Sequence, residues 1–379
     1  MAGDPRAYER RHGLDAVIRA QRATYAAVDE IGRVVDAEGI ECGWWKGGQL
    51  QVATTRAQLG RLDALIARRR RLGDRDEDLR RLGPSEVADR VRVAGTLAGA
   101  FSPHCARVDP ARLTRGLAAA AEGRGVRIFE QTAARSIAPG RVVTDRGTLA
   151  ADHVLRCTEA FTVEQAGQGR RYLPLYSLMI ATEPLPASAW AELGWAGRET
   201  VSDTRHLFFY AQRTADDRIA IGGRGAPYGL GSPINEARAQ DAGVRERLTR
   251  TVARHFPSAA GARITHHWGG PLAVPRDWCM SVSHDPATGL GEAGGYSGHG
   301  VVAANIAGRT LADLVLGRST DLVSLPWVGH RSRSWEPEPL RFLASRAIVG
   351  IMGSSDRVEE RIPRTARRMR LIEPFLSGR

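Results

Sequence analysis

This sequence has almost no lysine. Lys46 is the only one in 379 residues, although lysine and arginine together number 54 and the formal net charge is +12. So large a cationic excess ordinarily indicates nucleic-acid binding, because it neutralises phosphates. The charges here, however, are arginines spread through acidic, alanine-rich segments such as 245–254, which is typical of a compositional bias. We therefore expect no nucleic-acid partner.

Cysteine and long apolar runs are also scarce. The four cysteines stand singly, with no C-x-x-C pair and no metal-ligand spacing, so the sequence predicts neither a disulfide framework nor a metal site. No run approaches the roughly 18 apolar residues of a membrane span, and no stretch after Met1 resembles a secretory signal. A soluble, cytoplasmic protein is expected, and its length suffices for two domains or for one with a large insertion.

Hydrophobic periodicity divides the chain into a mixed first part, a β-rich middle and a mixed end. Helical spacing of apolar residues predicts helices over 4–37, 55–72, 111–122, 233–255 and 301–316, with a short helix after Gly83-Pro84-Ser85-Glu86. Short or alternating apolar runs predict strands at the end of 43–53 and over 126–130, 142–144, 153–157, 172–182, 206–213, 218–223, 263–273, 279–283 and 289–293.

The most informative segment is the glycine-rich stretch 291–300, which joins the last predicted strand to the last predicted helix. Five glycines in ten residues let a backbone approach a flat ring, and the helix N-terminus offers free N–H groups and partial positive charge. A flavin suits such a place, because negative charge develops at its N1 and C2 carbonyl on reduction. A glycine turn that only caps a core helix accounts for the same residues.

This segment resembles the C-terminal flavin segment of the D-amino-acid-oxidase-like superfamily, which includes glycine oxidase, sarcosine oxidase and γ-glutamylputrescine oxidase. Asp109-Pro110 opening a helix and Gly125-Val126 opening a strand resemble further family segments in order and spacing. The family's Ala-Thr-Gly or Ala-Thr-Asn turn reads Cys157-Thr158-Glu159 here, which keeps only the threonine. The block 173–184 resembles the γ-glutamylputrescine oxidase branch most.

The resemblance implies an α/β fold of mixed α+β type: an incomplete flavin-binding dinucleotide fold without its first βαβ unit, plus a mainly antiparallel β substrate domain. In the family a G-x-G-x-x-G loop seats the flavin pyrophosphate, and none precedes the helix expected over 4–37. The glycine clusters 222–225 and 291–300 lie too far along the chain to replace it. We therefore expect a chain that begins late in the family pattern.

The same resemblance gives the expected domains. The FAD-binding domain is expected to comprise 1–40, 100–165 and 277–325, and the substrate domain 41–99 and 166–276. Residues 326–379 are expected to form an arginine-rich helical tail.

FAD is the cofactor that the resemblance implies. Its contacts are expected along the glycine-rich segment and at two earlier positions: Gly294, Gly295, Tyr296, Ser297, Gly298, His299, Gly300, Val301, Ala134 and Thr158. His299 is also a candidate catalytic residue, because a place beside the flavin would tune its reduction. A polar residue at a helix cap is an equal explanation.

Aromatic residues on the predicted middle strands are candidates to enclose an amine. Tyr210 and Trp268 are the catalytic candidates, and Tyr176 and Phe208 are expected to contact substrate, although such residues are more often core. Arg224, beside glycines at the end of a strand, is a candidate ligand for a substrate carboxylate, with a surface role as the alternative.

The family chemistry is transfer of a hydride to flavin N5 from the carbon beside an amine nitrogen, with molecular oxygen as the expected acceptor. The sarcosine-oxidase branch has a carboxylate-binding lysine two positions after the last loop glycine, where this chain has Val302. A simple α-amino acid is therefore a less suitable substrate than a longer amine such as a γ-glutamylated polyamine.

Two other functions stay open. In the first, the chain is a noncatalytic remnant or a partner-binding protein of the same fold, with the glycine-rich segment kept as scaffold. Alternatively, the arginines of 361–370 bind nucleic acid or an anionic membrane, because Arg364, Arg367, Arg368 and Arg370 stand at helical spacing. The sequence does not indicate an oligomeric state.

Overall fold

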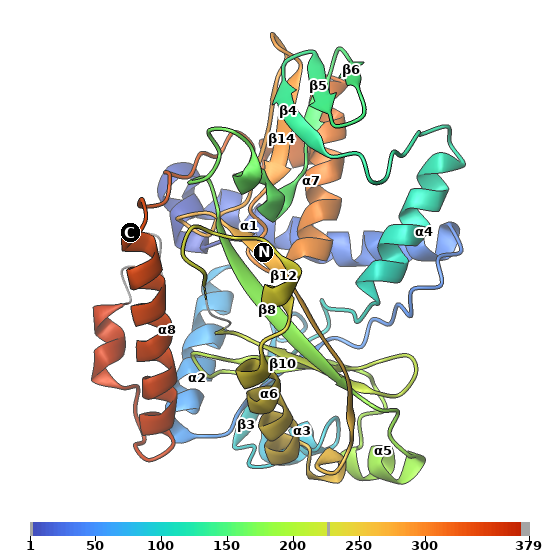
Figure 1. Ribbon diagram of the computed structural model, residues 1–379. Coiled ribbons are helices and arrows are strands. Elements are labelled where there is room, and N and C mark those ends of the chain that lie inside the picture. The colour runs from blue at the N-terminus through green and yellow to red at the C-terminus, as the bar shows by residue number, and fades with distance from the viewer. Residues whose placement is uncertain (1–2, 226–227, 373–379) are drawn as a thin grey trace.

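The computed structural model describes residues 3–225 and 228–372 (Figure 1). Its helices are α1 (Pro5–Ala37), α2 (Arg56–Arg71), α3 (Pro84–Ala88), α4 (Pro110–Glu122), α5 (Ala187–Leu193), α6 (Ala242–His255), α7 (Gly300–Val315) and α8 (Leu340–Glu359). Its strands are β1 (Gln49–Ala53), β2 (Arg80–Leu82), β3 (Ala98–Ser102), β4 (Ala134–Ala138), β5 (Arg141–Thr144), β6 (Thr148–Ala150), β7 (Val154–Arg156), β8 (Leu173–Thr182), β9 (Thr200–Asp203), β10 (Phe209–Arg213), β11 (Ile219–Gly223), β12 (Ile264–Val274), β13 (Ser281–Asp285) and β14 (Leu290–Gly294).

The largest sheet has eight strands in the order β12-β8-β11-β10-β9-β1-β3-β2. Every neighbouring pair is antiparallel except β1 and β9, which run parallel. One face of this sheet carries the main hydrophobic core, where Leu178 and Phe209 pack with Leu248 of α6 and Trp190 of α5. Because successive side chains of a strand point to opposite faces, the side chains on the other face of the sheet do not enter this core.

A second sheet, β13-β14-β7, pairs β14 with β7 in parallel and with β13 in antiparallel. Helices α1 and α7 cover it, and Val17 of α1, Ile306 of α7 and Val282 of β13 belong to one buried cluster. The third sheet, β4-β5-β6, is antiparallel and stands at the top of Figure 1. The molecule is thus a mixed α/β fold with mostly antiparallel sheets.

The longest helix, α1, has both of its expected limits but contains a break. Asp4 caps its N-terminus by accepting from the backbone N–H of Arg6 at 3.0 Å. Gly13 interrupts the helical backbone with φ 79° and ψ 169°, values that glycine adopts without steric cost. The turns before Gly13, which carry Arg10 and Arg11, therefore have a different axis from the rest of α1.

Two predicted elements are wrong. Residues 126–129 form no strand, and Val126, Ile128 and Phe129 are 53%, 42% and 52% exposed, because no strand of the described residues lies beside them. The long helix predicted over 233–255 begins only at Ala242. Asp241 ends the preceding loop by accepting from the N–H of Val244 at 2.8 Å, as an N-cap does.

The arginine-rich end also differs from expectation. Helix α8 ends at Glu359, and of the described residues after it, up to 372, Arg367–Leu371 form a short 3-10 turn. Arg364 therefore shares no helix with Arg367, Arg368 and Arg370. Helix α8 lies beside α2, where Glu359 accepts from Arg61 at 2.5 Å.

One literal G-x-G-x-x-G string does occur, as Gly289-Leu290-Gly291-Glu292-Ala293-Gly294. Residues 290–294 of it are strand β14, so its glycines do not form the turn between strand and helix that the dinucleotide fingerprint requires. In the described part of the chain, no helix combines the length and apolar character needed to cross a bilayer.

Candidate functional site

A loop of five residues, 295–299, joins β14 to α7 and is held tightly at its first half. Gly295 has φ 81° and Gly298 has φ 96°, values that favour glycine. A Cβ atom at Gly294 would lie 3.0 Å from the hydroxyl of Tyr172, and one at Gly295 would lie 2.6 Å from Cγ of Pro275. These two glycines are therefore required by packing inside the protein.

The second half of the loop is open. A Cβ atom at Gly300 would meet no protein atom within 4 Å, and one at Gly298 would meet only Leu272 at 3.6 Å. Helix α7 starts here without a side-chain cap. Its first N–H groups have no partners inside the helix, so this end presents free donors and partial positive charge to an open space.

His299 occupies the N-cap position of α7. The residue is exposed, and local desolvation of its ring lowers its pKa. The side chain is therefore neutral at physiological pH and adds no cation to this end of the helix.

Glu159 holds the first half of the loop in place, and no sequence pattern marked it as a site residue. Its carboxylate accepts from the backbone N–H groups of Tyr296 at 2.9 Å and Gly295 at 3.4 Å. Burial raises the pKa of Glu159 to about 7, although these N–H groups act in the opposite direction. Its φ of 44° is unusual for glutamate, and the two hydrogen bonds offset that strain.

The uncovered face of the eight-stranded sheet continues from this loop. Ser297 donates its N–H to Ala273 O of β12 at 3.2 Å, which ties the loop to the sheet. The strand register places Trp268 opposite Met179, Met179 opposite Gly222, and Gly222 opposite Tyr210. Residues directly opposite one another share a face, so Trp268 and Tyr210 lie on one face as two ends of a row.

Phe208 and Arg224 lie next to this row, and Arg224 has an unusual environment. Its guanidinium lies 5.6 Å from the ring centre of Phe208 and 5.0 Å from that of Trp278. Within the described residues, no carboxylate lies within ion-pair distance of it. Burial lowers the pKa of Arg224, and no neighbouring charge acts against this effect. Arg224 is thus a desolvated cation between two aromatic rings.

Trp278 is a second site residue that no sequence pattern predicted. It has φ 64°, a backbone conformation that is costly for a bulky residue. Ser297 of the glycine loop donates to its carbonyl oxygen at 3.1 Å. This contact links the loop to the residue that covers Arg224.

The other predicted site residues lie in different parts of the structure. Tyr176 is buried on the opposite, core face of the sheet, and its hydroxyl donates to Asn235 O at 3.1 Å. Tyr296 and Val301 pack into hydrophobic clusters behind the loop. Ala134 is exposed on β4, in a different sheet from β14, while Thr158 directly precedes Glu159. The structure therefore connects the loop through Trp278 to Arg224, Phe208 and Tyr210. Trp268 lies on the same face at the far end of the row, and Tyr176 and Ala134 lie elsewhere.

Comparison with protein families also indicates a flavin-binding protein. The model of the family described as FAD dependent oxidoreductase matches residues 5–314. The chain belongs to this family of FAD-dependent oxidoreductases. The open N-terminus of α7 and the space beside Gly298 and Gly300 fit a flat, electron-accepting ring of this kind.

Two curated relatives show how far the similarity extends. The chain is 32% identical over 257 residues to the probable oxidoreductase OrdL of Rhizobium meliloti strain 1021, covering 66% of this chain and 54% of that protein. It is 27% identical over 320 residues to γ-glutamylputrescine oxidoreductase of Escherichia coli K12, covering 82% and 70%. The chain thus spans about half the length of the first relative.

Solved structures share the fold. Glycine oxidase from Geobacillus kaustophilus superposes with a TM-score of 0.67 at 22% identity, covering 83% of each chain. L-proline dehydrogenase from P. horikoshii gives 0.68 at 17% identity, covering 81% of this chain and 82% of the other. These likenesses show that the chain shares the fold of these two proteins.

Proposed function

We propose that this chain contributes the flavin-ring site and the substrate site of an FAD-dependent oxidoreductase that oxidises a C–N bond in an amine bearing a carboxylate. When bound, the flavin supplies an acceptor for the hydride, and molecular oxygen is the acceptor that we expect to reoxidise it. The observation that carries the proposal is Arg224, a partly buried cation with no carboxylate partner among the described residues, on the sheet face that continues from the glycine loop.

The chain's own residues divide the work between holding the cofactor and holding the substrate. The N-terminus of α7 would hold the flavin ring through its free N–H groups. Arg224 would bind the substrate carboxylate with its planar donors, and the rings of Phe208 and Trp278 keep the guanidinium in place. Tyr210 and Trp268 would form apolar walls that exclude water from the amine.

The proposed substrate class combines two charged ends. Val302 leaves the start of α7 without a cation for an α-carboxylate, whereas Arg224 provides one farther along the sheet. A longer amine with a distant carboxylate, of which γ-glutamylputrescine is an example, suits this arrangement. The named relative from Escherichia coli supports the same substrate class.

The flavin's pyrophosphate needs a separate place. The only G-x-G-x-x-G string of this sequence is largely occupied by β14, and in the described residues β7 pairs with β14 alone. We propose that the free edge of β7 is where a phosphate-binding strand, turn and helix would join the sheet.

A noncatalytic, partner-binding role is a second candidate. It is favoured by the exposed Val126, Ile128 and Phe129, which form an apolar surface without a covering element among the described residues. Under this alternative the chain would bind no flavin.

Anaerobic mixing of the FAD-loaded protein with amines tests the proposed function. We expect γ-glutamylputrescine to bleach the flavin absorbance near 450 nm, on the order of tenfold or more faster than putrescine, which lacks the carboxylate. Arg224→Gln should abolish that preference. Arg213→Gln, which removes an arginine paired with Asp217 at 2.8 Å, is the control and should retain it. Equal bleaching by both amines, or an unchanged preference in Arg224→Gln, would reject the carboxylate site.

A further inference from the structure

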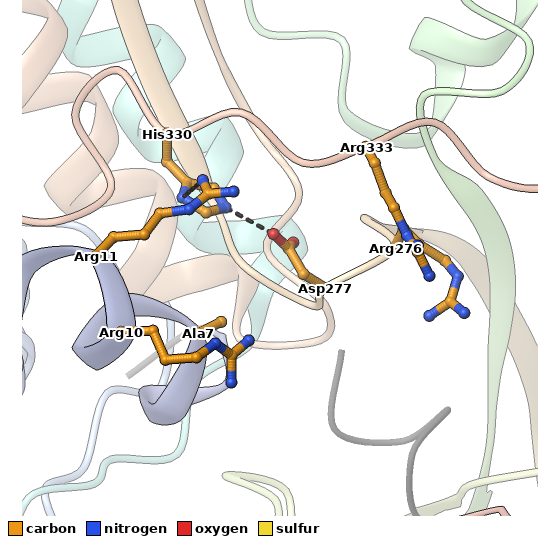
Figure 2. A pocket seen from close by; sticks show the side chains of 7 residues that line it. All are labelled: Ala7, Arg10, Arg11, Arg276, Asp277, His330 and Arg333. Carbon is orange, nitrogen blue, oxygen red and sulfur yellow. Dashed lines mark hydrogen bonds and ion pairs between the residues drawn. The ribbon is translucent and has the colours of Figure 1, made fainter. Parts of the chain in front are cut away.

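A cavity lined by arginines lies between the first turns of α1, the loop before β13 and the segment around His330 (Figure 2). Its volume is about 170 Å³, and it is lined by Ala7, Arg10, Arg11, Arg276, Asp277, His330 and Arg333. A water molecule takes up about 30 Å³ in the liquid, so the cavity has room for a group of several heavy atoms.

The floor of the cavity is a fixed pair of residues. His330 is buried, and its Nε2 lies 2.8 Å from Oδ2 of Asp277. Its Nδ1 lies 3.3 Å from Nη1 of Arg11. Arginine offers only donors, so Nδ1 is the acceptor and Nε2–H donates to Asp277. These two contacts fix the orientation of the ring.

The walls carry more positive than negative charge. Arg276 is buried and held in place by Glu336 at 3.1 Å and by the ring of Trp335 at 5.2 Å. Arg11 and Arg10 enter from α1, and Figure 2 shows them on the side of Asp277 opposite to Arg276 and Arg333. The described residues include no ion-pair or hydrogen-bond partner for the Arg10 side chain. Four guanidinium groups thus face two carboxylates: Asp277, which His330 engages, and Glu336, which pairs with Arg276 and, at 4.0 Å, with Arg333.

We propose that this cavity binds a small dianionic oxyanion, in the form of inorganic phosphate or a phosphate monoester. Guanidinium groups from α1 on one side and from the loops on the other can donate to several oxygens at once, and such charge-assisted bonds are the strong ones. Asp277 fixes His330, and the anion lies among the arginines.

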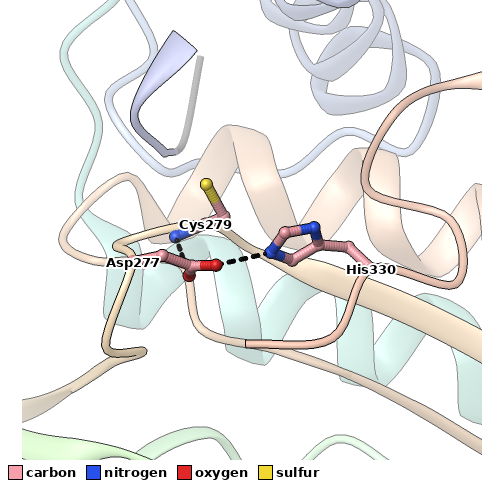
Figure 3. A group of neighbouring side chains, drawn as sticks. All are labelled: Asp277, Cys279 and His330. Carbon is pink, nitrogen blue, oxygen red and sulfur yellow. Dashed lines mark hydrogen bonds and ion pairs between the residues drawn. The ribbon is translucent and has the colours of Figure 1, made fainter. Parts of the chain in front are cut away.

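A metal ion is the competing occupant, because Asp277, Cys279 and His330 place their ligand atoms within 4.8 Å of one another (Figure 3). The geometry favours the anion. The sulfur of Cys279 points away from the Asp277–His330 hydrogen bond and lies 3.8 Å from Asp4 O. Burial raises the pKa of Cys279, which keeps the thiol protonated, and the guanidinium of Arg11 at His330 repels a cation.

Titration of the full chain with inorganic phosphate at constant ionic strength, followed by calorimetry, tests the proposal. We expect saturable binding with one site, and Arg10→Glu should weaken it by at least about tenfold. The matched control is Arg19→Glu, on the same helix and equally exposed, which should change the dissociation constant by less than about twofold. Glycerol 3-phosphate should compete with inorganic phosphate, whereas vesicles containing phosphatidic acid should not.

Three results would overturn the proposal. The first is an absence of saturable phosphate binding. The second is an equal loss in Arg10→Glu and Arg19→Glu, which would indicate attraction by net charge alone. The third is stabilisation by Zn²⁺ but not by phosphate, lost in Cys279→Ser, which would assign the cluster to a metal. None of these results bears on the flavin site, so they leave the proposed function unaffected.

Discussion

At the scale of single residues, the two most informative side chains are ones whose local energies are unfavourable. Arg224 is a desolvated cation without a carboxylate partner among the described residues, and Trp278 beside it has a positive φ. Such costs persist where the rest of the structure enforces them, and they concentrate at functional sites. Both residues lie where the glycine loop meets the open face of the sheet.

The desolvation of the Arg224 charge disfavours the folded state, so removing the charge should stabilise the protein. We expect Arg224→Met to raise the free energy of unfolding by up to about 1 kcal/mol, because a flexible apolar chain replaces a partly buried charge between two rings. Equilibrium urea unfolding measures this change. Arg213→Met, which breaks an ion pair with Asp217, should instead destabilise the protein or leave it unchanged. A destabilised Arg224→Met variant would show that Arg224 has a structural role.

Glu159 predicts a pH dependence with a defined sign. Burial raises its pKa from 4.5 to about 7, so its contribution to stability is complete below pH 4.5 and is lost as the pH rises through 7. The upper bound of the loss is about 3 kcal/mol. Unfolding curves between pH 4.5 and 8 should show this decline relative to Glu159→Gln. Parallel pH profiles for the two proteins would contradict it.

At the scale of elements, the loop between β14 and α7 separates glycines needed for packing from glycines needed for a ligand. Gly295→Ala should destabilise the protein by roughly 1–3 kcal/mol, because a side chain there has a strained φ and lies 2.6 Å from Pro275. Gly308→Ala, in the middle of α7 with open space around it, should be neutral or stabilising by about 0.5–1 kcal/mol. Thermal unfolding of the two variants compares them directly, and equal midpoints would contradict this division.

Helix α8 is fastened by one buried carboxylate. Burial alone would raise the pKa of Glu359, but hydrogen bonds from His206, from the N–H of Ala366 and from Arg61 lower it to about 2. The stability that it contributes is therefore present above pH 4.5 and lost as the pH falls through 2. Amide protection factors along α8, which correct for the intrinsic pH dependence of exchange, should fall on acidification from pH 5 to 3, and Glu359→Gln should show low protection already at pH 5. Protection factors in α8 that change neither with pH nor in Glu359→Gln would contradict this role of Glu359.

At the scale of the whole molecule, the sequence predicted the parts with strong local patterns. The glycine spacing of 291–300 and the apolar periodicity after it predicted β14, the loop and α7 within one or two residues. Helix α1 and strands β8 and β12 were also found, since their patterns are long.

What the sequence did not predict depends on distant contacts. Glu159 and Trp278 have positive φ without being glycine, and no local pattern marks such positions. Tyr176 and Tyr210 are both strand aromatics, and only the register puts one in the core and the other beside Arg224. The segment 126–130 has a strand pattern, yet a strand needs a neighbour, and none is present in the described residues. The domain limits stay a prediction.

The central claim is that the N-terminus of α7 holds a flavin ring. Equilibrium titration of the chain with riboflavin and with FAD, followed by flavin fluorescence, tests it most directly. We expect both flavins to bind with dissociation constants within about threefold of each other, because the site contacts the ring, and Gly300→Val to weaken both by at least about tenfold. A valine at 300 meets no protein atom near its Cβ, so the fold should be intact, and Gly308→Val is the control on the same helix. Absence of flavin binding, or binding that persists in Gly300→Val, would contradict the account.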